Sequence, residues 1–255
     1  MFELTGVTKS YGSHVALAPL DLTIADRDTV AIVGPSGSGK ATLLHLLAGV
    51  VQPDAGVLTL AGRNARSIPH GREFSRLAGL MHQQYDLVPT LSVLHNVLAG
   101  RLGEWGFFKA LFSLAFPQER RQAFEALERV GIGAKLYERT SRLSGGEQQR
   151  VALARLLLQN PRAILADEPV SSVDPARAED IVRLLVQVAG EGQQTLVASL
   201  HSVPLALAHF QRVIGLRLGE LVFDLPAHAV QQHHLADLYV LDQQTVPLVG
   251  EAVGC

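Results

Sequence analysis

The chain of 255 residues contains a single cysteine, Cys255, and no apolar run near the roughly 20 residues needed to cross a bilayer. One cysteine excludes a disulfide within the chain, so we expect the reducing cytosol as its compartment. Residues 1–12 lack a basic stretch followed by an apolar one, and we therefore expect no signal peptide. A role at a membrane would require other subunits that hold this chain there.

The sequence also lacks an excess of positive charge, internal repeats and low-complexity tracts. Its formal net charge is −2, whereas nucleic-acid-binding chains normally show a basic excess, so we predict no nucleic-acid partner. Hydrophobic residues make up 47% and charged residues 18% of the chain, proportions typical of a folded globular protein rather than a disordered one. The length allows one large domain or a domain with a sizeable insertion.

Short apolar segments that alternate with helical patterns predict an α/β fold. Buried strands are expected in "DTVAIVG" (28–34), "RAILADEP" (162–169) and "QTLVASLH" (194–201), and a half-buried strand in "VALAPLDLTI" (15–24). The first buried strand leads into leucines at helical spacing, and a helix beginning at Pro175 has an apolar stripe. This alternation predicts a mostly parallel core sheet flanked by helices.

The middle of the chain, residues 86–160, has a mainly helical pattern and is interpreted as a helical subdomain inserted into the α/β body. Residues 1–85 and 161–225 then form the α/β core, so that residues 1–225 make up one domain. We expect residues 226–255 to be a peripheral C-terminal extension, with a helix over residues 223–239.

The stretch "GPSGSGKAT" (34–42), named the phosphate loop below, follows the first buried strand and opens the helix after it. Glycines at positions 34, 37 and 39 allow backbone N–H groups to approach phosphate oxygens, and the helix N-terminus adds partial positive charge. Lys40 would reach the outer phosphates of a nucleotide. The candidate binding residues are Gly34, Pro35, Ser36, Gly37, Ser38, Gly39, Lys40, Ala41 and Thr42.

Two further segments strengthen this hypothesis. "ILADEP" places Asp167 and Glu168 at the end of a buried strand, where one carboxylate can hold Mg²⁺ and the other can polarise a water. "LSGGEQQR" (143–150), named the signature segment below, supplies Ser144, Gly145 and Gly146 at a second helix start. Each segment alone is compatible with an ordinary turn or loop, but their combination in this order favours a nucleotide site.

These segments resemble the ATP-binding subunits of ABC transporters over residues 2–225, nearly the whole chain. The resemblance adds four residues: Tyr11 for adenine stacking, Gln83 for sensing Mg²⁺ and γ-phosphate, Asp174 for contact with the opposite subunit, and His201 for the γ-phosphate. It implies ATP and Mg²⁺ as ligands, Glu168 as the general base, and an N-terminal antiparallel β subdomain beside the parallel sheet.

The resemblance also implies partners. Two copies, most simply a homodimer, would close head to tail on ATP, which lies between the phosphate loop of one copy and residues Ser144–Gly146 of the other, with Asp174 at the same interface. Transmembrane permease subunits would hold the dimer peripherally at the cytoplasmic face of the cell membrane, and an extracytoplasmic solute-binding protein would act indirectly. The cassette itself does not recognise cargo.

Ala41 departs from the family pattern, which has a Mg²⁺-binding Ser or Thr after the lysine. Alanine cannot coordinate, although a water can occupy the empty position. Thr42 leaves the helix in another direction, and we do not expect it to replace the ligand. We therefore predict a hydrolytic cassette with impaired metal binding, with a catalytically silent nucleotide-binding partner as the alternative.

Residues 91–132 contain an aromatic-rich stretch that resembles phosphonate-importer ATP-binding subunits, including those for phosphite and hypophosphite. Importers of polar amino acids and lipoprotein-release systems are the alternatives, and a DNA-repair or translation cassette is disfavoured because no coiled-coil insert is present. The aromatic side chains are expected mainly in the core of the helical subdomain, with an apolar surface toward a membrane subunit as the alternative. They are Trp105, Phe107, Phe108, Phe112 and Phe116.

Overall fold

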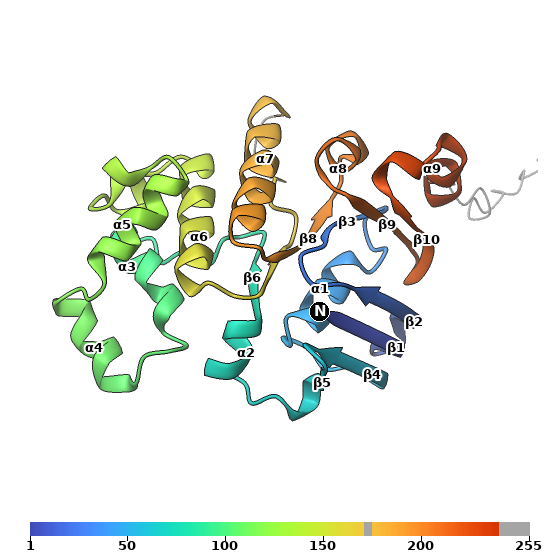
Figure 1. Cartoon of the computed structure of the whole chain (residues 1–255), viewed down its shortest axis with the longest axis horizontal. Coiled ribbons are helices and arrows are strands. Elements are labelled where there is room, and N and C mark those ends of the chain that lie inside the picture. Colours follow the sequence, from blue (N-terminus) through green and yellow to red (C-terminus); the bar gives the residue numbers. More distant parts are fainter. Residues whose placement is uncertain (171–174, 240–255) are drawn as a thin grey trace, which may run out of the picture.

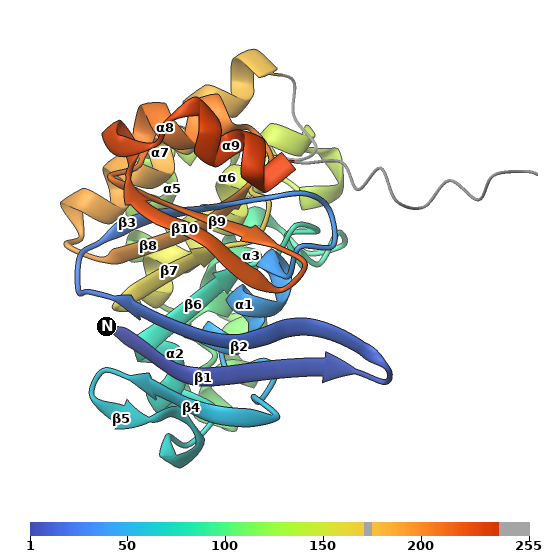
Figure 2. The same ribbon diagram turned by 90° about the vertical axis from the view of Figure 1, so that its right-hand side faces the viewer.

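The computed structural model describes residues 1–170 and 175–239, and two sheets form its framework (Figures 1 and 2). The first is an antiparallel sheet with the strand order β2-β1-β4-β5, which confirms the N-terminal antiparallel subdomain. Its strands are β1 (Phe2–Tyr11), β2 (His14–Ile24), β4 (Ala55–Leu60) and β5 (Arg63–Asn64).

The second sheet is parallel except for its edge strand β10, and its order is β10-β9-β3-β8-β7-β6. Every residue of β3, β7 and β8 is buried, as expected for short β-branched and aliphatic runs covered on both faces. The strands are β3 (Thr29–Val33), β6 (Ala78–Met81), β7 (Ala163–Ala166), β8 (Thr195–Leu200), β9 (Arg212–Arg217) and β10 (Glu220–Pro226).

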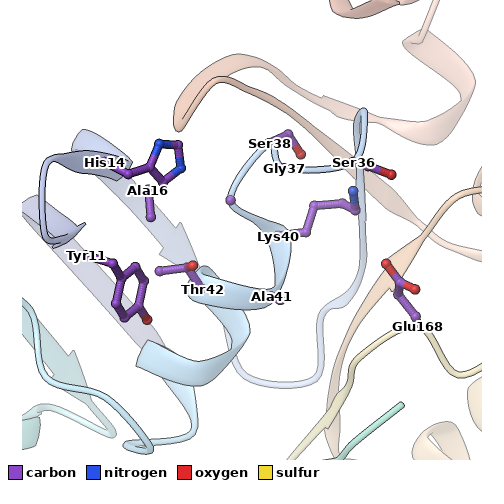
Figure 3. A pocket seen from close by; sticks show the side chains of 11 residues that line it. Tyr11, His14, Ala16, Ser36, Gly37, Ser38, Lys40, Ala41, Thr42 and Glu168 are labelled. Carbon is purple, nitrogen blue, oxygen red and sulfur yellow. The ribbon is translucent and has the colours of Figure 1, made fainter. Parts of the chain in front are cut away.

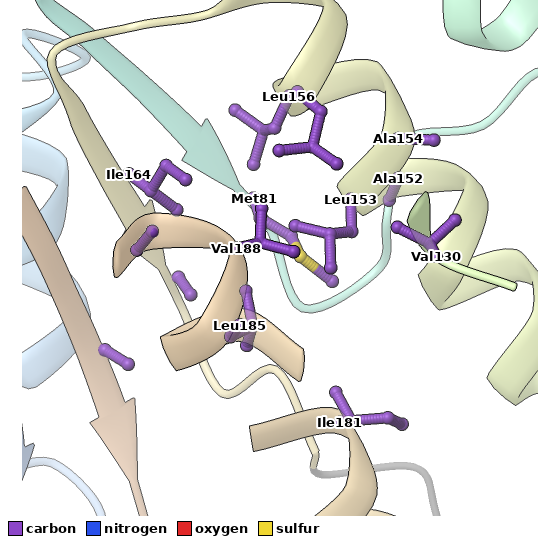
Figure 4. Close-up of a cluster of buried hydrophobic side chains, with 14 of the residues drawn as sticks. Met81, Val130, Ala152, Leu153, Ala154, Leu156, Ile164, Ile181, Leu185 and Val188 are labelled. Carbon is purple, nitrogen blue, oxygen red and sulfur yellow. The ribbon is translucent and has the colours of Figure 1, made fainter. Parts of the chain in front are cut away.

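Helices cover both faces of this sheet. On one face α1 (Lys40–Leu47) packs its leucines between the parallel and the antiparallel sheets. On the other face α6 (Gly145–Gln159), α7 (Pro175–Glu191) and α8 (Val203–His209) bury a second cluster. In this cluster Met81 of β6 meets Leu153 and Leu156 of α6 and Leu185 of α7 (Figure 4). The α/β body also contains α2 (Arg72–Leu77) and α9 (Gln232–Tyr239).

The predicted helical middle is present and lies at one end of the molecule, away from the antiparallel sheet (Figure 1). Its helices are α3 (Val93–Leu98), α4 (Phe107–Ala115), α5 (Arg120–Arg129) and the long helix α6. Both α3 and α5 contact α6. Short 3₁₀ turns complete the described chain at Ala65–Ser67, Ala99–Arg101, Gly133–Lys135, Thr140–Arg142 and Ala227–Ala229.

The structure corrects the helix predicted over residues 223–239. Residues up to Pro226 belong to β10, where the guanidinium of Arg212 pairs with Asp224, and helix α9 begins only at Gln232. For residues 223–226, backbone pairing with β9 therefore outweighs the local preference for a helix. Leu238 of α9 is fully buried and belongs to the same hydrophobic cluster as Phe223. The domain boundary at residue 225 stays a prediction.

The prediction that most of the aromatic side chains lie in the core of the helical subdomain is wrong. Phe107, Phe108, Phe112 and Phe116 are between 55% and 84% exposed, and only Trp105 packs against the core. The reason is that α4 turns Ser113, its one buried residue, toward the subdomain, which directs its phenylalanines outward. No described helix is long and apolar enough to span a membrane.

Candidate functional site

The phosphate loop is a backbone cradle between β3 and α1. Gly34, Gly37 and Gly39 have φ values of 154°, 77° and 101°, which side-chain-bearing residues rarely adopt. A Cβ at Gly34 would lie 2.0 Å from the carbonyl oxygen of Leu216, and one at Gly39 would lie 2.6 Å from that of Ala16. The loop therefore requires glycine at both positions for conformational and steric reasons.

Lys40 folds back over this loop. Its Nζ donates hydrogen bonds of 2.8 Å to the carbonyl oxygens of Gly34 and Pro35. Burial lowers the pKa of Lys40, while the nearby carboxylates of Glu168 and Asp167 act in the opposite direction. An ammonium group that is hydrogen-bonded to neutral carbonyls can exchange these contacts for phosphate oxygens, with which it forms stronger hydrogen bonds.

An open pocket lies over the loop and extends to the hairpin of β1 and β2 (Figure 3). Tyr11, 47% exposed, lies at its rim together with His14 and Ala16. Sequence analysis did not find His14 and Ala16, although Tyr11 and His14 are direct partners across a tight hairpin, a signal available from the turn pattern. The other lining residues are Ser36, Gly37, Ser38, Gly39, Lys40, Ala41, Thr42 and Glu168.

The carboxylates predicted at the end of β7 are held by β8. Ser199 donates its hydroxyl to Asp167 Oδ1 at 2.9 Å and accepts the backbone N–H of Glu168 at 2.8 Å. His201 Nε2 lies 2.5 Å from Glu168 Oε1. The parallel register of β7 and β8 brings residues 167–168 and 199–201 to the same sheet edge as the phosphate loop, as expected for ligand sites in such sheets.

The donor set near the loop fits a Mg²⁺–nucleotide complex in part. Asp167 Oδ2 remains available for a cation, and the buried hydroxyl of Ser38 has no hydrogen-bond partner in the described structure. Ala41 lines the pocket with a methyl group where the family pattern has a hydroxyl. Gln83 is exposed in the loop that follows β6. The same loop is held by Arg155, whose guanidinium donates hydrogen bonds to the backbone carbonyls of Tyr85 and Asp86.

The signature segment forms the start of α6. Ser144 caps the helix by accepting the N–H of Glu147, whose carboxylate accepts the N–H of Ser144 in return. Ser144 and Gly145 are exposed, and neither they nor Gly146 line the pocket of their own chain. This helix start is therefore open to a ligand held by another molecule. Asp174 lies outside the described residues.

Known proteins are similar to this chain in sequence. The family model described as ABC transporter matches residues 17–171. The chain is 45% identical to the phosphonates import ATP-binding protein PhnC of Pseudomonas putida, over 96% of this chain and 92% of that protein. It is 46% identical to PhnC 1 of Pseudomonas aeruginosa, over 89% of this chain and 86% of the relative.

Solved structures agree with the fold. The dimeric structure of MJ0796, described as a bacterial ABC transporter cassette, matches with a TM-score of 0.77 and 29% identity, over 90% of this chain and 100% of that chain. The MJ0796 dimer in a post-hydrolysis state, bound to ADP and Pi, matches with a TM-score of 0.75 and 30% identity over the same shares. By its sequence match and its architecture, the chain belongs to the ABC transporter family.

Proposed function

We propose that this chain is the ATP-hydrolysing subunit of a membrane importer for phosphonate or a related reduced-phosphorus anion. The main support is the 45% identity to a phosphonates import ATP-binding protein over 96% of the chain, together with a phosphate loop whose pocket is also lined by Glu168. The aromatic stretch of residues 91–132, which resembles phosphonate-importer subunits, is a second argument for this cargo.

In this proposal the triphosphate binds to the backbone N–H groups of the phosphate loop and to Lys40, which leaves the carbonyls of Gly34 and Pro35. Tyr11 stacks on adenine at the rim of the pocket. Glu168 accepts the proton of the attacking water, and His201, hydrogen-bonded to it, orients the γ-phosphate. Asp167 and Gln83 would hold Mg²⁺, and the bound ion would supply positive charge to stabilise the phosphate oxygens.

We further propose that two copies close on ATP. The exposed Ser144 and Gly145 at the start of α6 support this, because they leave the positive end of the helix dipole available to the γ-phosphate of a second copy. Asp174 contacts the opposite subunit in the same arrangement. Hydrolysis removes the γ-phosphate that joins the copies, and their separation drives the membrane subunits.

Permease subunits and a solute-binding protein are the proposed partners, with the chain at the cytoplasmic face of the membrane. The exposed phenylalanines of α4 support contact with another protein, because contiguous apolar patches commonly mark interaction sites. This favours the alternative that the sequence left open for the aromatic stretch, an apolar surface toward a membrane subunit.

Cargo is tested on the assembled transporter. We expect the membrane and solute-binding proteins to co-purify with this chain, and a phosphonate to stimulate ATP hydrolysis in liposomes that contain all of them. Polar amino acids and phosphate provide the matched controls. Stimulation by an amino acid but not by a phosphonate would favour the other small-solute importers, and a lipoprotein as stimulus would favour a release system.

The change Ala41→Ser tests the metal site. A serine hydroxyl would restore an oxygen ligand, so we expect Mg²⁺-dependent ATP turnover to rise by roughly 10- to 100-fold, the equivalent of about 1–3 kcal/mol in the transition state. Phosphate release measured across a Mg²⁺ titration gives both the rate and the metal dependence. Ala41→Val provides a control without an oxygen, and an unchanged or lower rate in Ala41→Ser would contradict the assignment of this position.

A further inference from the structure

His45 lies on α1 one turn after Ala41, and residues four apart share one face of a helix. Helical side chains tilt toward the helix N-terminus, so a residue covers the surface of the turn that precedes it. The imidazole of His45 is therefore directed toward the turn of Ala41, where the hydroxyl typical of the family is absent.

The Nε2 atom of His45 is buried and has no hydrogen-bond partner in the described part of the chain. Asp167 Oδ2 lies 3.9 Å from it, which is too long for a hydrogen bond. The other carboxylate oxygen, Oδ1, is occupied by Ser199. A buried polar atom without a partner is rare in folded proteins and often marks a missing ion or water.

A small movement would allow these two atoms to share a cation. For octahedral coordination with bonds of about 2.0–2.2 Å, two ligand atoms lie about 3 Å apart when adjacent and about 4.3 Å apart when opposite, so the 3.9 Å separation must change by a few tenths of an ångström or more. The His45 side chain is 29% exposed and its Nε2 is not fixed by a hydrogen bond within the described residues, so its ring can make this adjustment. These two atoms would bind the cation together with Gln83, the ligand proposed above, and phosphate oxygens and water would complete the coordination. The described residues contain no group of three or more His, Cys, Asp or Glu that could hold a metal, so such a site forms only with nucleotide.

We propose that His45 Nε2 and Asp167 Oδ2 together bind the divalent cation of the nucleotide, and that this site favours a first-row transition metal ion such as Mn²⁺ or Co²⁺ over Mg²⁺. Imidazole nitrogen is a good ligand for transition metals, whereas Mg²⁺ prefers oxygen. His45 thereby compensates for the ligand that Ala41 cannot supply. This inference rests on the proposed nucleotide site.

Mn²⁺ itself provides the spectroscopic probe. We expect pulsed electron paramagnetic resonance of the Mn²⁺ complex with a non-hydrolysable ATP analogue to show nitrogen coupling, which changes when the protein is labelled with ¹⁵N-histidine. The coupling should be absent in His45→Phe, which keeps the ring volume but offers no nitrogen. His82→Phe is the matched control, because the His82 ring lies 5.8 Å from that of His45 and should leave the signal unchanged.

The preference of the site for Mn²⁺ over Mg²⁺ provides a second measurement. This preference would not change if His45 had only a structural role. The ratio of analogue affinities with Mn²⁺ and with Mg²⁺ should be at least about tenfold higher in the wild type than in the double variant Ala41→Ser/His45→Phe, in line with the usual effect of groups that tune a metal site. His45→Phe alone should lose affinity with Mn²⁺ while its unfolding midpoint without nucleotide stays near the wild-type value.

The outcomes separate this inference from the proposed function. Analogue binding without histidine coupling, or an equal metal ratio in all variants, would overturn the role of His45 and leave the ATP site intact. Failure of the wild type to bind the analogue with any metal would overturn both. Coupling that persists in His45→Phe but disappears in His82→Phe would assign the nitrogen to the other histidine and reject the proposal.

Discussion

Replacing Glu168 with glutamine is expected to lower ATP turnover by roughly 10²- to 10⁴-fold, the usual contribution of a general base. The side chain lines the nucleotide pocket and is fixed on both sides, by its backbone N–H to Ser199 and by its carboxylate to His201. An amide keeps the size of the carboxylate but cannot accept the proton of the attacking water. Release of radiolabelled phosphate at saturating metal gives the rate.

The same variant should retain ATP binding, because Glu168 does not contribute to the phosphate cradle. With ATP it should therefore accumulate as a dimer, measured by light scattering after size-exclusion chromatography. Glu125→Gln is the matched control, because Glu125 is exposed on α5 and its carboxylate pairs with Arg121 on the same helix. Equal turnover in the wild type and Glu168→Gln would indicate the silent nucleotide-binding partner, and a monomer with ATP would contradict the head-to-tail dimer.

The variant Gly34→Ala should lose detectable ATP binding and unfold at lower urea concentration, by about 1–3 kcal/mol in the free energy of unfolding. The added Cβ would lie 2.0 Å from the carbonyl oxygen of Leu216 and 2.8 Å from Ser38 Oγ. The carbonyl of Leu216 belongs to the backbone and cannot rotate away as a side chain does, so the phosphate loop itself must shift. Because the first peptide of the cradle moves, the N–H groups no longer converge on phosphate.

Gly37→Ala is the control for this prediction. Gly37 belongs to the same loop and also has a positive φ, but nothing lies within 4 Å of an added Cβ. Both substitutions introduce conformational strain, and only the first introduces a clash with backbone. Circular dichroism in urea and titration with a fluorescent ATP analogue measure the two effects, and equal losses in both variants would show that strain rather than the contact with Leu216 is limiting.

The phosphate loop and the parallel sheet were predictable because their requirements are local. "GPSGSGKAT" after an apolar run specifies strand, glycine turn and helix within a few residues, and the structure has β3, the loop and α1 in that order. The segment at 223–239 was predictable only from Gln232 onward. Its first residues pair with β9, and a strand partner is not visible in the local sequence.

The aromatic stretch shows why burial was harder to predict than helix type. Hydrophobicity alone favours a core position, yet the exposed fraction of Phe108 is 84%. Which face of α4 turns inward depends on how its ends are attached, and Trp105 and Lys109 both contact Glu119 just before α5. Such contacts join residues that no periodicity relates.

The sequence by itself determined the α/β class, the helical insertion and the identity of the nucleotide-binding segments, because each depends on residue type and short-range spacing. Tertiary structure alone decided which groups meet: the contact of Glu168 with His201, the hold of Ser199 on Asp167, and the unpaired nitrogen of His45 beside the same carboxylate. These pairs are 33, 32 and 122 residues apart in the chain. Only the register of β7 with β8 and the packing of α1 on the sheet bring them within a few ångströms of one another.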